Sequence, residues 1–287
     1  MPGSANRLTT TRVYDNLNRL TSISSAPSAA SALSHAYTYN SANQRTHATR
    51  EDLSHWDFSY DALGQVTAGT KKLSTGEIIL GDDYAYTFDD IGNRKTATAN
   101  GQTSLYNSSL VNQYLRRTVP GALDVFGTAK ADATVTVTSP AGSDTIFPTT
   151  RQGERFNRQL TVDNSSMAQY PGITVTGVKN NVGPNGEDAL TAQTRQSFVP
   201  KTPEAFGYDA DGNLTQDGRW TYTWDADVAR QRGDGPTGRL ARRASRAGAH
   251  FVGGEARQNR LVSMETRADV VAQASSLPRP APLSFWV

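Results

Sequence analysis

The side chains that could do acid–base or metal chemistry in this chain are few. Histidine occurs four times and cysteine is absent, which excludes disulfides, thiolate catalysis and cysteine-bound zinc. His55 and Asp57 are two residues apart in a segment that we expect to be a strand, so they share one strand face. We interpret them as polar residues of that strand whose side chains are hydrogen-bonded to neighbours. The alternative is a metal or proton-transfer site. The other histidines are His35, His47 and His250.

Carboxylates are plentiful but do not form an enzyme motif. The sequence has no Gly-rich phosphate loop, no G-x-S-x-G elbow and no H-E-x-x-H pair. The alternative that the sequence leaves open is a pair of carboxylates of the kind that glycosidases use. Oxygen ligands for calcium gather in the loop of Asn185, Glu187 and Asp188, but they lack a regular ligand spacing, so we interpret this loop as a polar turn. We therefore predict that the chain is not an enzyme and needs neither cofactor nor metal.

Composition indicates β-structure rich in turns. The chain has 287 residues, of which 36% are hydrophobic, and it is rich in Thr, Asn, Ser and Gly, which suit short strands and turns. No apolar run approaches the roughly 18 residues of a membrane span, so we predict no membrane span. The first ten residues, MPGSANRLTT, contain no hydrophobic segment, so we expect no signal peptide in this chain.

An internal repeat supplies the elements that position these side chains. Each copy has an aromatic residue, Asp or Asn, two variable residues, Gly or Asn, and then a polar strand with Thr. The copies are YDNLNRLTSI from Tyr14, YNSANQRTHA from Tyr39, YDALGQVTAG from Tyr60, FDDIGNRKTA from Phe88 and YDADGNLTQD from Tyr208. A degenerate copy ends near Tyr114, and a further one begins with WDAD at Trp224.

Each copy predicts a β-hairpin with one aromatic face. Aromatic residues precede the turn at every second position and thus lie on one face of the arriving strand. The Asp accepts a hydrogen bond from the backbone two residues on, and Gly or Asn supplies the positive φ of a short loop. We expect the rings to be largely buried on one sheet face, the alternative being ordinary strand core in a β-sandwich. These rings are Trp56, Phe58, Tyr60, Tyr84, Tyr86, Phe88, Trp220, Tyr222 and Trp224.

The residues that we predict to build the repeat are the aromatic, acidic and glycine positions of its copies. They are Tyr14, Asp15, Tyr39, Tyr60, Asp61, Gly64, Phe88, Asp89, Gly92, Tyr208, Asp209, Gly212, Trp224 and Asp225. The recurrence of the aspartates at equivalent turn positions favours an architectural role over a catalytic one.

Tandem copies of aromatic–Asp–x–x–Gly–Asn/Arg–x–Thr resemble the YD repeat of the rearrangement hot spot (Rhs) proteins, which are related to teneurins and toxin-complex shells. Residues 14–100 and 206–264 carry the resemblance, about half of the chain. It implies hairpins that spiral into a hollow β-shell, often around a C-terminal toxin, in a protein that is exported or attached to the cell surface. The family's core motif, rich in Asp-Pro, Gly, Asn and Tyr, has no match here. This leaves shell closure, self-cleavage and toxin release without support, and implies that the C-terminal core and effector segment is missing.

Two segments depart from the repeat. Residues 117–203 contain Val/Thr-rich strands at 133–139, 158–164 and 172–178 and predict an inserted β-sandwich-like module. Residues 228–258 carry seven Arg and a net charge of +5, which leaves the rest of the chain at −3. We interpret them as a poorly ordered insertion that interrupts the hairpin at Trp224, the alternative being a basic RNA-binding arm. Joining Asp227 to Asn259 would give WDADNRLVSM, a normal copy.

The predicted fold is thus all-β, with stacked hairpins forming a twisted sheet or partial shell. The predicted domains are hairpins over 1–116, the inserted module over 117–203, hairpins over 204–271 with the insertion at 228–258, and a disordered tail over 272–287. We predict a structural scaffold of a secreted or surface-attached shell or toxin-delivery protein. The alternative is an adhesin whose 117–203 module binds carbohydrate through aromatic stacking. A nucleic-acid partner is not expected.

Overall fold

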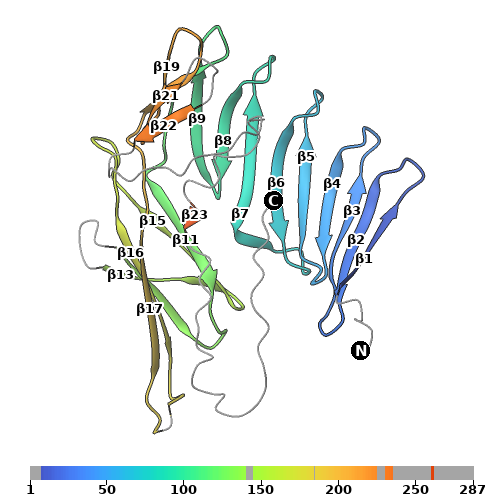
Figure 1. The fold of residues 1–287 in the computed structure, drawn as a ribbon. Helices are drawn as coiled ribbons and strands as arrows, with labels where there is room; N and C mark the ends of the chain where they lie inside the picture. Colours follow the sequence, from blue (N-terminus) through green and yellow to red (C-terminus); the bar gives the residue numbers. More distant parts are fainter. Residues whose placement is uncertain (1–7, 140–144, 184, 225–229, 235–259, 262–287) are drawn as a thin grey trace, which may run out of the picture. The chain divides into compact units, whose positions relative to one another are not determined.

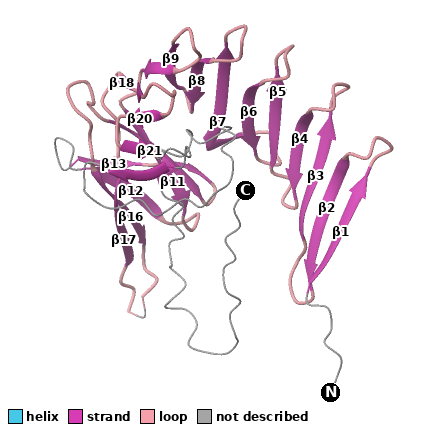
Figure 2. Cartoon of the chain, turned by 45° about the horizontal axis from the view of Figure 1, so that its top comes forward, coloured by secondary structure: helices cyan, strands magenta, loops and turns pink. Residues whose placement is uncertain are grey.

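In a computed structural model, the structure describes residues 8–139, 145–183, 185–224, 230–234 and 260–261. These residues form strands joined by turns and loops, and no helix occurs among them (Figure 2). The predicted all-β class is therefore confirmed. Across the same residues, no helix long and apolar enough to span a membrane is found.

The repeats form one long antiparallel sheet, which agrees with the predicted stack of hairpins. Its eleven strands follow one another in chain order up to β10, and β18 lies at the far edge. The order from β1 to β9 can be followed in Figure 1. They are β1 (Leu8–Tyr14), β2 (Leu20–Pro27), β3 (Leu33–Tyr39), β4 (Arg45–Arg50), β5 (His55–Tyr60), β6 (Val66–Lys72), β7 (Ile78–Phe88), β8 (Arg94–Ala99), β9 (Gln102–Ser108), β10 (Tyr114–Arg117) and β18 (Glu204–Ala205).

One register recurs in the hairpins. The residue before each loop pairs with the residue six positions later, and a register shift lies beside that pair. The pairs are Tyr14 with Leu20, Tyr39 with Arg45, Tyr60 with Val66, Phe88 with Arg94 and Ser108 with Tyr114. The degenerate copy near Tyr114 is thus a hairpin of the same kind, with Ser108 in the place of the aromatic residue.

The two faces of this sheet differ in chemistry. On one face, aromatic rings of the arriving strands pair laterally with small residues of the return strands. Ala48 lies between Tyr37 and Trp56, and Gly69 lies between Phe58 and Tyr84. The rings also contact each other, as in Trp56 and Tyr84 with centroids 6.1 Å apart. On the opposite face, threonines pair across strands, for example Thr87 with Thr96 and Thr98 with Thr103.

The aromatic face is less buried than the sequence predicts. All nine rings of the predicted triplets are half-buried, and none is fully buried. In the hairpin array, each strand makes its main contacts with the strands beside it in the sheet. The rings are therefore covered mainly by one another and by basic side chains, such as Arg45, whose guanidinium carbon lies 4.0 Å from the Tyr37 ring centroid.

The second group of repeats forms a four-stranded sheet of β19 (Gly207–Tyr208), β20 (Leu214–Gln216), β21 (Thr221–Trp224) and β22 (Arg230–Asp234). Here the predicted interruption at Trp224 is wrong. Trp224 pairs with Arg230 in the same six-residue register, so the tract itself supplies the return strand. Arg260 and Leu261 form β23, which pairs in parallel with Asp124 and Val125 instead. The rest of the tract, 235–258, and the tail, 272–287, lie outside the described residues.

The remaining strands form two further four-stranded sheets. One contains β13 (Thr145–Pro148), β12 (Thr134–Ser139), β16 (Gly172–Lys179) and β17 (Ala189–Gln196), and the other contains β14 (Thr150–Gln152), β15 (Arg155–Thr161), β11 (Ala122–Thr128) and β23 (Arg260–Leu261). Alternating apolar residues of these strands are buried, among them Leu123, Val137 and Phe156. Ala48 and Ile79 are the buried apolar residues of the hairpin strands.

The described residues fall into two compact units. One comprises those of 1–125, 159–170 and 197–261, and the other those of 126–158 and 171–196. Within the first unit, the two ends of the predicted insertion are neighbours, because Arg116 pairs with Ala205 and Arg117 with Glu204. The predicted domain boundaries themselves stay a prediction.

Candidate functional site

The hairpin loops repeat one hydrogen-bonded structure, which the loop after Tyr60 illustrates. The Asp61 amide donates to the Gln65 carbonyl at 3.0 Å, and the Gly64 amide donates to the Asp61 carbonyl at 3.1 Å. Gly64 has φ of 84°, the left-handed conformation that ends a type I turn in a three-residue hairpin loop. The Asp61 carboxylate accepts hydrogen bonds from the amides of Leu63 and Gln65 at 3.0 and 2.9 Å.

The same set of bonds occurs at the loops that begin at Asp15, Asn40, Asp89, Ser109 and Asp209. The left-handed position is filled by Asn18, Asn43, Gly92, Asn112 and Gly212. The predicted Asp15, Asp61, Asp89 and Asp209 thus lie at loop starts, and the predicted Gly64, Gly92 and Gly212 lie at positions of positive φ. Asp225 lies outside the described residues.

In three of these loops, hydrogen bonds lower the pKa of the carboxylate. Hydrogen bonds from the Asn93 side chain and from backbone amides lower the pKa of Asp89 from its ordinary value. The same bonds from Asn213 lower the pKa of Asp209. For Asp15, the backbone amide of Arg19 is the largest cause of a lowered pKa. The carboxylates of Asp15, Asp89 and Asp209 are therefore held in their charged, turn-forming state.

A second regularity links four of the hairpins to the hairpin before them. Tyr39 donates its hydroxyl to the Leu20 carbonyl, and Tyr60 donates to the Arg45 carbonyl, both at 2.7 Å. Further along the chain, the Tyr208 hydroxyl donates to the backbone carbonyl of Tyr114 at 3.0 Å, and the Trp224 indole donates to the backbone carbonyl of Leu214 at 2.7 Å. In each case the acceptor belongs to the preceding hairpin. It is the cross-strand partner of the last residue before that hairpin's loop.

This carbonyl needs a partner because it lies outside the ladder to the next strand. The pairing of β4 with β5 begins at His47, two residues beyond Arg45. The aromatic donor therefore satisfies a backbone acceptor that the ladder leaves unpaired. Sequence reasoning assigned the aromatic residue only to ring packing and missed this bond. The preference for Tyr or Trp, which carry a donor, over Phe was the signal available.

A third contact joins neighbouring loops at their tips. At the left-handed position, Asn43 accepts from the Arg19 guanidinium of the preceding loop at 2.9 Å, and Asn112 accepts from the Asn93 amide at 3.1 Å. Loops with glycine at this position also lie close to the preceding loop. At Gly92, an added Cβ would lie 3.4 Å from the side-chain amide oxygen of Gln65. The loops thus form a continuous edge, which we call the loop ladder.

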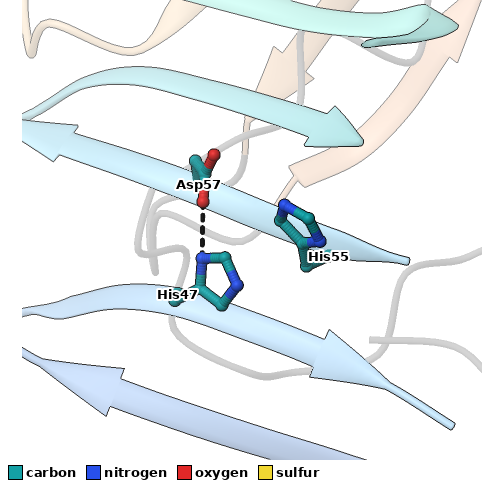
Figure 3. A group of neighbouring side chains, drawn as sticks. All are labelled: His47, His55 and Asp57. Atoms are coloured by element: carbon teal, nitrogen blue, oxygen red, sulfur yellow. Dashed lines mark hydrogen bonds and ion pairs between the residues drawn. The ribbon is translucent and has the colours of Figure 1, made fainter. Parts of the chain in front are cut away.

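A separate polar cluster lies on the threonine face of the sheet. It contains His47 from β4 and His55 and Asp57 from β5 (Figure 3), and one potential ligand atom of each lies within 4.8 Å of the others. His47 Nδ1 lies 2.5 Å from Asp57 Oδ1, and Lys72 Nζ lies 2.8 Å from Asp57 Oδ2. Partial burial raises the pKa of Asp57, but the hydrogen bonds from Lys72 and His47 outweigh it and lower the pKa overall.

The predicted pair of His55 and Asp57 therefore does share a strand face, and His47, which the sequence left unassigned, joins it through cross-strand pairing with Asp57. The loop of Asn185, Glu187 and Asp188 has the geometry of a polar turn. The Asp188 carboxylate accepts from the Asn181 amide at 3.0 Å, and the Glu187 carboxylate accepts from the Asn185 amide at 2.9 Å.

Comparison with known proteins gives little beyond this geometry. No family model and no curated protein sequence matches the chain. Among solved structures, the chain is similar to one titled "Crystal Structure of TcdB2-TccC3-Cdc42", with 10% sequence identity and a TM-score of 0.37. The alignment covers 81% of this chain and 16% of that chain.

Proposed function

We propose that this chain is a non-enzymatic structural scaffold, a segment of an Rhs-like YD-repeat shell or surface protein. The observation that carries the proposal is the recurrent bond from the aromatic residue of one hairpin to the backbone of the preceding one. A catalytic carboxylate needs a free oxygen facing a substrate, whereas the repeated carboxylates here accept hydrogen bonds from their own loops.

The proposed place of action is the outside of the cell, as part of an exported or surface-attached toxin-delivery protein. The similarity of the repeats to Rhs sequences supports this part. Labelling intact cells of the source organism with an antibody against the chain, before and after lysis, tests it. We expect labelling before lysis, with a periplasmic or cytosolic marker labelled only afterwards. Labelling of the chain only after lysis would contradict the surface location.

A carbohydrate-binding role for the inserted 117–203 segment is the second proposal. Support comes from the sequence, which places aromatic residues such as Tyr170 and Phe198 in this segment, and the Tyr170 side chain is exposed. A glycan array probed with the full chain tests it. Binding that Tyr170→Ala abolishes supports the adhesin, and a blank array leaves the scaffold as the function of the whole chain.

A further inference from the structure

The cluster on the threonine face has the composition of a transition-metal site. From the positions of His47, His55 and Asp57 we infer that this face binds one late first-row divalent ion such as Zn²⁺, through two imidazoles and one carboxylate. Imidazole suits zinc, copper and nickel, whereas magnesium and calcium prefer all-oxygen sites. Three protein ligands leave the remaining coordination positions to water.

The strand register brings the three ligands together. Asp57 is the cross-strand partner of His47, and His55 precedes Asp57 by two residues, so all three project from the same face (Figure 3). The imidazoles of His47 and His55 have centroids 4.4 Å apart. Zinc takes nitrogen ligands at about 2.0–2.1 Å and carboxylate oxygens at about 2.0–2.2 Å. Ligand atoms within 4.8 Å of one another can reach one ion by small side-chain rotations.

The contacts of His55 and Asp57 show which atom of each is available to bind a metal. His55 Nδ1 lies 3.1 Å from the Leu53 carbonyl oxygen. A carbonyl only accepts, so Nδ1 carries the proton and, in the neutral ring, Nε2 keeps the lone pair that binds a metal. Lys72 holds Asp57 through Oδ2, which leaves Oδ1 facing His47. The bound ion replaces the proton of this hydrogen bond, and His47 Nδ1 and Asp57 Oδ1 move apart to admit it, because two tetrahedral zinc ligands at about 2.0–2.1 Å lie about 3.3 Å from each other.

The site is open to solvent, since the side chains of His47 and Asp57 are 33% and 38% exposed. An ion can therefore enter without unfolding the sheet. Lys72 works against the ion because its ammonium group is bonded to the same carboxylate. Replacing Lys72 by Gln removes this repulsion and should tighten metal binding, whereas a Lys72 with a merely structural role would give no such gain. The exposed position keeps the gain modest, roughly two- to fivefold.

Isothermal titration calorimetry with ZnCl₂ at pH 7.5, on the full chain after EDTA treatment, tests the inference. We expect one zinc ion per chain, at least tenfold weaker binding in His47→Gln, His55→Gln and Asp57→Asn, and tighter binding in Lys72→Gln. His35→Gln is the matched control, because His35 lies on the aromatic face beside Tyr37, and His250→Gln controls for the residues outside the described ranges. Excess Mg²⁺ should not compete.

Thermal unfolding with and without zinc separates loss of binding from loss of folding. A ligand that binds only the folded state raises the Tm, so zinc should raise the Tm of the wild type and of His35→Gln. The three ligand variants should unfold cooperatively but show no such rise. The inference would be overturned if the wild type did not bind zinc, or if all three ligand variants bound zinc as tightly as the wild type.

Discussion

A left-handed residue ends each loop of the ladder, and the chain fills that position with either glycine or asparagine. Gly92 has φ of 91°, and Asn43 and Asn112 have φ of 62° at the equivalent position. Asparagine tolerates this conformation better than other non-glycine residues because its short polar side chain bonds locally. A β-branched side chain does not, because its substituents clash with the backbone.

Replacing Gly92 by Val should therefore lower the free energy of unfolding by about 1–3 kcal/mol. The cost comes from the backbone, since the added Cβ would meet only the end of the flexible Gln65 side chain, at 3.4 Å. Gly92→Asn is the matched control and should be close to neutral, because Asn112 already makes the equivalent bond to the preceding loop. Urea unfolding of both variants measures the difference. Equal costs for Val and Asn would show that positive φ is not required there.

The loop carboxylates make part of the stability dependent on pH. The pKa of Asp89 is lowered in the folded chain, first by its bond from Asn93. A lowered folded pKa means that this stabilisation is fully present above the unfolded value of about 3.9 and is lost as the pH falls through the folded value. Asp89→Asn should therefore lower the Tm at pH 6, and the gap to the wild type should shrink towards pH 3. Thermal unfolding across this range measures it, with Asp90→Asn as the neighbouring control. A gap that is constant with pH would contradict a role for the charge.

Between strands, stability depends on contacts that the repeat pattern does not display. The pattern predicted the loops and the hairpin pairing, because both depend on residues close together in sequence, such as Asp61 and Gly64. It did not reveal that the Tyr60 hydroxyl reaches Arg45 or that Ala48 and Gly69 fit between rings, because these contacts depend on the register between hairpins. It also misplaced the partner of Trp224, since an Arg- and Gly-rich strand such as Arg230–Asp234 has no apolar alternation to mark it.

The bond between successive hairpins gives a pair of opposite tests. Tyr60→Phe removes the donor to the Arg45 carbonyl and should cost about 0.5–1.5 kcal/mol. Phe88 occupies the same place in the next hairpin but has no hydroxyl, so Phe88→Tyr adds a donor towards the Val66 carbonyl and should stabilise by up to a similar amount. Urea unfolding of the two variants and of the double variant measures both effects. A loss of stability in both single variants would mean that the ring, and not the hydroxyl, is what the position requires.

At the scale of the chain, residues 118–203 begin and end beside one pair of strands, β10 and β18. Arg117 Nε lies 2.6 Å from Glu204 Oε2, and the side chains are 11% and 3% exposed. The Gly218 amide donates to the other Glu204 oxygen at 3.0 Å. Removing one member of a buried ion pair leaves an uncompensated charge, so Glu204→Gln should cost about 3–5 kcal/mol. Thermal unfolding measures this, and the double replacement of Arg117 and Glu204 by Met should cost much less. An equal loss in the double variant would contradict the charge argument.

The same junction predicts that the hairpin array folds without residues 118–203. Arg117 and Glu204 are direct cross-strand partners, as are Ala99 and Gln102, which the chain joins by the two residues Asn100 and Gly101. Asn100 and Gly101 have φ of 51° and 80°, which is the turn that the twist of two antiparallel strands favours. Replacing residues 118–203 by Asn-Gly should therefore close a hairpin between β10 and β18 without strain.

Hydrogen exchange of this shortened chain should show unchanged protection for β3 to β7. Protection should fall only near β8 and β9, where Asn100 loses its bond to Asp124 and Gln102 loses its bond to Gln159. The same excision closed by Val-Val serves as control and should fold less well, because β-branched residues resist positive φ. General loss of protection in the Asn-Gly chain would show that the hairpins depend on the segment for their fold.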